Sequence, residues 1–196
     1  MRVPTLAQLA LLFFLGGTFL HFMIAGGRTL YTTDPENERG SLIGQVSFLI
    51  TGTLVVWWLG AYVPIRPVNG VFAAGLLAVA IGLYEWARHT IWGRRFGYAL
   101  GDHVPEALCK SGPYRFIRHP IYLSYMLAFL ASAIALPHWL TAATLVSNVV
   151  LFSIAARSDE RTIATSALAA DYAAYRARAG MFWPRLSRSG IDRSTP

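Results

Sequence analysis

The chain contains several apolar runs of about twenty residues, and these runs limit the possible fold more than any other feature. An α-helix rises 1.5 Å per residue, so a run of about twenty residues crosses a hydrocarbon core of roughly 30 Å. Only 14% of the 196 residues are charged and 55% are hydrophobic, whereas roughly a quarter of the residues in soluble domains are charged. The sequence therefore predicts an all-α integral membrane protein.

Five membrane helices are expected, within a single domain over residues 1–186. Their approximate bounds are 5–24, 42–63, 68–87, 120–136 and 139–156. The first run also resembles a cleavable signal peptide, but its length and the further runs behind it favour a membrane helix. Pro137-His138 separates the last two segments, so these should form a helical hairpin. The polar residues 187–196 are expected to be disordered.

Arginine, histidine and tyrosine concentrate where the fourth segment begins. The stretch Gly112 to Tyr122 reads Gly-Pro-Tyr-Arg-Phe-Ile-Arg-His-Pro-Ile-Tyr. Pro120 is expected at the first helical position, because proline has no N–H group and its fixed φ suits a helix start. The unpaired N–H groups of that helix start then lie beside Arg118 and His119. These features predict an anion-binding site at a membrane surface.

The distribution of basic residues predicts the orientation in the membrane. With five segments, the loops after the first and third segments and the C-terminal tail share one side, and they hold fifteen of the seventeen basic residues. By the positive-inside rule this side is cytoplasmic and the N-terminus is outside. The net charge of +7 suggests no nucleic-acid partner, because the basic residues lie in loops between apolar runs. The single cysteine gives neither an intrachain disulfide nor a zinc-ligand pattern, so no metal site is expected.

Glu160 lies just beyond the fifth segment, and the hairpin should return it close to Arg118, His119 and Tyr122. Cations and backbone N–H groups can hold a carboxylate, while Glu160 can hold an ammonium group and nearby tyrosines can face a soft cation. This set matches a zwitterionic amino acid with a sulfonium group. On residue types alone the alternative stays open, since interfacial Arg, His and Glu commonly just mark the membrane boundary.

Two other polar stretches flank the membrane segments. Glu85 precedes Arg88 by three residues and His89 by four, which predicts an ion pair on one helix face at the interface. The polar connection 90–111 comes directly before the predicted anion site and is expected to form its wall or lid. The loop 26–40 has mixed charges typical of a solvated loop, and the sequence assigns it no role.

The Arg-His-Pro-x-Tyr element, followed by a helical hairpin, Glu160 and then Tyr172 and Tyr175, resembles the isoprenylcysteine carboxyl methyltransferase family. That family shares its pattern with membrane phospholipid methyltransferases. The likeness covers roughly residues 86–184. It implies S-adenosylmethionine as the methyl donor, bound in a pocket at the cytoplasmic face, and a lipophilic acceptor that enters from the bilayer.

Carried over by position, the resemblance implies which residues contact the cofactor. With Arg118 added as the cation of the anion site, they are Glu106, Ala107, Leu108, Cys109, Tyr114, Arg118, His119, Pro120, Tyr122 and Glu160. The family's arginine for the acceptor carboxylate falls at Ala156, so the candidate catalytic residue is Arg157, one residue along, which would orient or neutralise an anionic acceptor. Alternatively, Arg157 is a boundary arginine that extends to the membrane surface. Arg161 replaces the second acid of the family's Glu-Glu pair.

The expected function is S-adenosylmethionine-dependent methylation of a lipophilic acceptor such as an isoprenylcysteine carboxylate. Two alternatives keep the enzyme class, with a phospholipid amine or a small thiol as the acceptor. A third is a non-catalytic membrane protein for binding or assembly. A membrane reductase is a weaker alternative, because the chain has no glycine-rich dinucleotide motif of the soluble type.

Overall fold

The computed structural model describes residues 6–30, 52, 62–91 and 107–185. The helices of this part are α1 (Leu6–Leu30), α3 (Pro67–Ile91), α4 (Pro120–Ala135), α5 (Trp139–Ala164) and α6 (Ala169–Arg178), with a short 3-10 helix, η1 (Gly112–Arg115). The predicted second membrane segment and the loop 26–40 lie mostly outside the described residues. Glu106 and the tail 187–196 lie entirely outside them. For the described part, the all-α prediction is confirmed.

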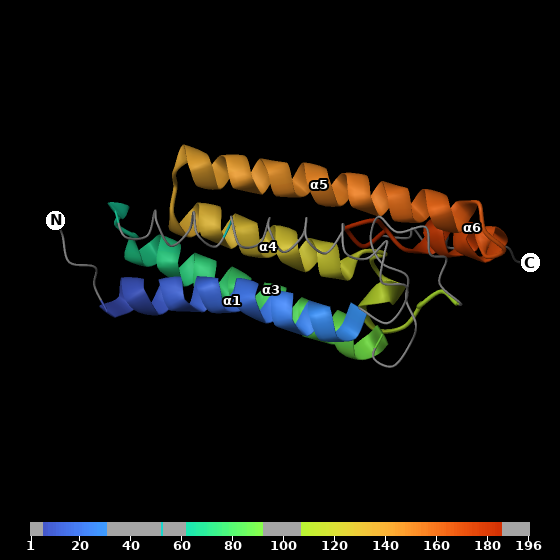
Figure 1. Cartoon of the computed structure of the whole chain (residues 1–196), viewed down its shortest axis with the longest axis horizontal. Coiled ribbons are helices and arrows are strands. Elements are labelled where there is room, and N and C mark those ends of the chain that lie inside the picture. The colour runs from blue at the N-terminus through green and yellow to red at the C-terminus, as the bar shows by residue number, and fades with distance from the viewer. Residues whose placement is uncertain (1–5, 31–51, 53–61, 92–106, 186–196) are drawn as a thin grey trace, which may run out of the picture.

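Among the described elements, the long helices α1, α3, α4 and α5 run side by side along the longest axis of the molecule (Figure 1). The turn that joins α4 to α5 lies at one end, whereas η1 and α6 lie at the other end. Helix α4 packs against both α3 and α5, and α1 packs against α3 and α4. The start of α4 and the end of α5 therefore meet at the end that carries α6.

Within the described residues, α3 and α5 are long and apolar enough to cross a membrane. The apolar part of α1, Gln8–Phe22, and α4 are shorter apolar helices. Large apolar side chains point outward along the bundle, for example Phe13 (74% exposed) and Val71 (74% exposed). Such extensive apolar exposure fits contact with lipid rather than with water.

Small residues allow α3 and α4 to approach each other closely. The buried face of α3 carries Ala73, Ala80 and Ala87, and that of α4 includes Ala128 and Ala131. Lipid tails are as apolar as the helix surfaces, so the hydrophobic effect does not drive membrane helices together. Small side chains instead stabilise the contact by allowing close van der Waals packing. Aromatic side chains fill much of the remaining core, among them Phe19, Tyr84, Tyr125, Phe129 and Phe152.

The turn between α4 and α5 confirms the predicted hairpin. His138 is the N-cap of α5, where its Nδ1 accepts a hydrogen bond from the Leu140 N–H at 3.2 Å. The Thr141 hydroxyl donates to the carbonyl of Leu136 at 2.6 Å. Helix α5 then continues to Ala164, two turns past the predicted end at Ala156, because the polar residues beyond Ala156 include no helix breaker.

The segment after α6 runs back against the chain that leads into α4. The Gly180 N–H donates to the carbonyl of Phe116 at 3.0 Å, and the Arg118 N–H donates to the carbonyl of Gly180 at 2.8 Å. A Cβ atom at Gly180 would lie 1.7 Å from the carbonyl oxygen of Trp183. Only glycine fits at this position without moving the backbone.

We predict that Gly180→Ala destabilises the protein by at least about 2 kcal/mol, because the new methyl group collides with backbone atoms rather than with a movable side chain. Gly82→Ala is the control, since nothing lies within 4 Å of a Cβ at that position and alanine favours a helix interior. Thermal unfolding in detergent should show a lower midpoint for the first variant only. Equal midpoints would contradict the close approach at Gly180.

Candidate functional site

Glu160 is the centre of a cluster of charged groups at the α6 end of the bundle. Its Oε1 atom lies 2.8 Å from both Nε and Nη2 of Arg118. His119 Nε2 lies 3.3 Å from the same oxygen. These contacts confirm that the hairpin returns the end of α5 to the start of α4. The three residues are called the Glu160 cluster below.

The ion pair at the centre of the Glu160 cluster is buried. Only 8% of Arg118 and 7% of Glu160 is exposed. The Arg118 guanidinium also donates to the carbonyl of Ala179, so the segment after α6 covers the pair. Charges removed from water need both a partner and hydrogen bonds, and this arrangement supplies both. The cationic and anionic halves predicted for ligand binding therefore neutralise each other.

Asp159 is a second carboxylate at this end of α5, which the sequence analysis did not single out. The Tyr122 hydroxyl donates to its Oδ2 atom at 2.9 Å. Tyr122 was expected close to Glu160, and its hydroxyl contacts the adjacent residue, Asp159. The Tyr122 ring stacks on His119 with an angle of 3° and a centroid distance of 5.4 Å. This stacking joins Asp159 and Tyr122 to the Glu160 cluster.

Two tyrosines of α6 lie over the cluster in different hydrogen-bonding states. The Tyr175 hydroxyl donates to the carbonyl of Tyr114 at 2.6 Å. The buried Tyr172 hydroxyl has no hydrogen-bond partner among the described residues. Burial, followed by the nearby Glu160 carboxylate, raises the pKa of Tyr172 above the ordinary value of a phenol. The phenol therefore keeps its proton beside Glu160.

The structure brings most of the predicted site residues to one place. Pro120 begins α4, as expected, directly after His119. Leu108 packs against Tyr172 and Tyr175. Ala107 and the buried Cys109 are the neighbours of Leu108 in the same segment.

Other parts of this end tie the site together or stand apart from it. Lys110 forms an exposed ion pair of 2.5 Å with Asp171 of α6, so the segment before η1 contacts that helix. Arg157 is exposed, three residues before Glu160 on α5, and is not part of the buried cluster.

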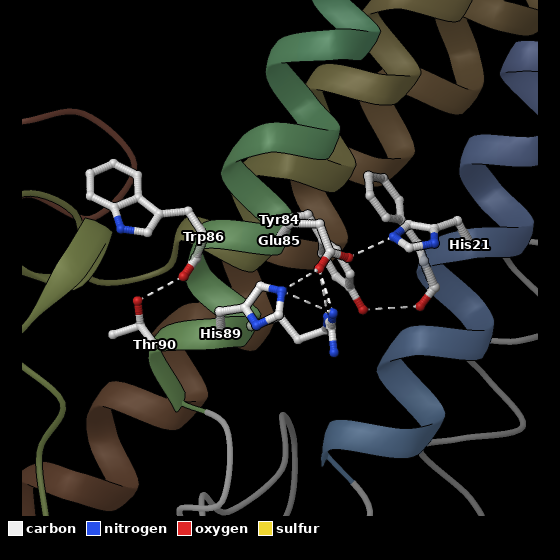
Figure 2. Close-up of polar contacts among 8 residues, drawn as sticks. His21, Tyr84, Glu85, Trp86, His89 and Thr90 are labelled. Atoms are coloured by element: carbon white, nitrogen blue, oxygen red, sulfur yellow. Dashed lines mark hydrogen bonds and ion pairs between the residues drawn. The ribbon is translucent and has the colours of Figure 1, made fainter.

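A separate polar cluster links α1 to the end of α3 (Figure 2). Glu85 contacts Arg88 at 2.5 Å and His89 at 3.4 Å, so the predicted ion pair is confirmed. His21 of α1 joins it, with Nε2 at 2.6 Å from Glu85. No group of three or more His, Cys, Asp or Glu side chains in the described ranges could hold a metal ion. This cluster fastens α1 to the bundle.

We predict strong coupling between Arg118 and Glu160. Arg118→Met leaves a buried carboxylate short of its main partner, and Glu160→Gln leaves a buried guanidinium short of its own, so each should destabilise the protein by about 3 to 5 kcal/mol. The double variant should lose less free energy of unfolding than the two single variants together, by at least about 1 kcal/mol. Unfolding in detergent measures all four proteins. Additive losses would show that the ion pair is not a unit.

Comparison with known proteins identifies the family. The model of the phospholipid methyltransferase family matches residues 68–167, which is half of the 196-residue chain. The matched region includes α3, η1, α4 and α5, and with them the Glu160 cluster. A search of curated proteins gave no match. The chain belongs to the phospholipid methyltransferase family, whose members are integral membrane methyltransferases.

Proposed function

We propose that this protein transfers a methyl group from S-adenosylmethionine to the headgroup of a membrane lipid, with the cofactor bound at the Glu160 cluster. The family supports a membrane methyltransferase that acts on lipid. The observation that carries the cofactor assignment is the buried Arg118–Glu160 pair beside the Tyr172 hydroxyl, which has no hydrogen-bond partner within the described part of the chain. Both charges and a spare donor are thus present in one place.

The chemistry of these groups fits the amino-acid end of the cofactor. A carboxylate on the ligand would take hydrogen bonds from Arg118, His119 and Tyr172. An ammonium group on the ligand would pair with Glu160. Because the protein groups already compensate each other, a ligand that carries both charges replaces their contacts without leaving a buried charge alone. A ligand with a single charge would leave one.

When bound, S-adenosylmethionine supplies a methyl group that its sulfonium sulfur has already activated. The protein therefore needs no strong nucleophile, and its residues act by binding, orientation and exclusion of water. The stacked rings of His119 and Tyr122 offer π faces suited to a soft cation. Phe182 lies with its ring centroid 6.1 Å from that of His119 and is proposed to help exclude water from the bound cofactor.

For the acceptor, we propose the amine nitrogen of a phospholipid headgroup, reached from the bilayer at the α6 end of the bundle. Arg157 is exposed at this end and is proposed to hold the anionic phosphate of the same lipid. An isoprenylcysteine carboxylate is the second candidate, because Arg157 would serve a carboxylate equally well. Many arginine residues lie near this end of the bundle. By the positive-inside rule, they support a cytoplasmic position for the site.

Calorimetry with the purified protein in detergent tests the cofactor assignment. We expect the wild type to bind S-adenosylhomocysteine with a dissociation constant on the order of 1 μM. The variants His119→Ala and Glu160→Ala should abolish this binding. Each variant must first be shown to be folded by its thermal transition. Absence of binding to a folded wild-type protein would reject the cofactor site and favour a non-catalytic role.

The two tyrosines of α6 provide a matched pair of variants. Tyr172→Phe removes an unpartnered hydroxyl, so it should leave the stability of the free protein unchanged or higher but weaken S-adenosylhomocysteine binding by roughly 5- to 30-fold. Tyr175→Phe removes a satisfied hydroxyl, so it should lower stability by about 1 kcal/mol with little effect on binding. Thermal unfolding and calorimetry separate the two effects. The opposite pattern would place the ligand beside Tyr175 instead.

A further inference from the structure

The two oxygens of the Glu160 carboxylate have different surroundings. Oε1 accepts a hydrogen bond from Arg118 Nε at 2.8 Å, and His119 Nε2 lies 3.3 Å from it. Oε2 faces Arg176 of α6, whose Nε atom lies 4.0 Å away. Hydrogen bonds between charged groups are about 2.7 to 2.9 Å long, so Arg176 attracts Glu160 at this distance without a hydrogen bond. Arg118 and His119 thus engage one oxygen, and the other lies toward Arg176.

Arg176 is the exposed member of this arrangement. The exposed fraction of its side chain is 61%, against 8% for the Glu160 side chain. An ion pair with an exposed partner adds little to stability, because water and salt screen it. Arg118 already compensates the buried charge of Glu160 at 2.8 Å. The positive charge of Arg176 is therefore not needed to neutralise Glu160, and it can serve a ligand that arrives from water.

Arg176 and Tyr172 share one face of α6. They are four residues apart, and residues at this spacing are neighbours on a helix surface. The Tyr172 hydroxyl is buried and has no hydrogen-bond partner in the part of the chain that the structure describes. One turn of α6 thus carries a neutral donor and a cation, and the cation faces Glu160. Arg178, by contrast, is rotated by about 200° from Arg176 around the helix axis.

We propose that Arg176 binds the carboxylate at the amino-acid end of S-adenosylmethionine, while Glu160 Oε2 binds its ammonium group. This inference rests on the proposed function and adds a residue to the cofactor site. The two charged groups of an α-amino acid are attached to the same carbon. They therefore need an anion and a cation that lie close together but are not hydrogen-bonded to each other, as Oε2 and Arg176 do. Tyr172 supplies a further donor for the carboxylate.

Calorimetry with two ligands tests this role in the full-length protein in detergent. The ligands are S-adenosylhomocysteine and its decarboxylated analogue, which keeps the ammonium group. The wild type should prefer the first. Arg176→Gln should weaken S-adenosylhomocysteine binding roughly 10- to 100-fold, because it loses a hydrogen bond between charged groups. Binding of the analogue should stay within about twofold of wild type, because the partner of Arg176 is then already missing.

Two controls separate a ligand contact from general effects of charge or folding. Arg178→Gln removes the same charge from the last turn of the same helix, and it should leave both affinities within about twofold of wild type. The second control is the stability of the Arg176→Gln variant without ligand. Its thermal midpoint should stay within about 2 °C of wild type, because an exposed arginine at this distance contributes little to stability.

The outcomes separate this inference from the proposed function. If the wild type binds S-adenosylhomocysteine but Arg176→Gln binds it as tightly, the role of Arg176 is overturned and the cofactor site stands. The same holds if the wild type binds both ligands equally, or if Arg176→Gln weakens both alike or clearly lowers the thermal midpoint. An equal loss with Arg178→Gln would also overturn it. A folded wild type that binds neither ligand rejects the proposed function, and this inference with it.

Discussion

The buried contact between Arg118 and Glu160 is the interaction on which the site depends. It joins the start of α4 to the end of α5 at 2.8 Å, and through the carbonyl of Ala179 it also holds the segment after α6. A buried ion pair in itself adds little to stability, because desolvation offsets much of the attraction. Its effect is to fix geometry, since three segments must be in place before both charges are satisfied.

Much of this arrangement could be predicted from the sequence. Pro120 and Pro137-His138 are local signals that mark where helices start and stop, and the structure places the helix boundaries there. A hairpin of two helices then brings Glu160 back to Arg118 and His119. In such an antiparallel pair, the end of the second helix lies beside the start of the first. This inference needs only helix lengths and the position of one turn.

Other features depended on information that local patterns do not contain. Adjacent residues on a helix point about 100° apart, so which of Asp159 and Glu160 meets Tyr122 depends on the rotation of α5 in the bundle. Packing against α4 sets that rotation. The pairing of Gly180 with Phe116 and Arg118 joins residues more than sixty positions apart, and a single glycine gives no sign of its partner. The unpartnered hydroxyl of Tyr172 likewise emerges only once α6 is docked.

The contact of the segment after α6 with the start of α4 also sets an order of events during synthesis. A ribosome makes the chain from its N-terminus, so the membrane helices can insert while Gly180 and Met181 are still unmade. His119 receives its backbone partner, the carbonyl of Met181 at 3.2 Å, only after the chain has been made as far as Met181. Until then the segment after α6 cannot cover Arg118 and Glu160. The proposed ligand site is thus completed only after α4 and α5 have been made.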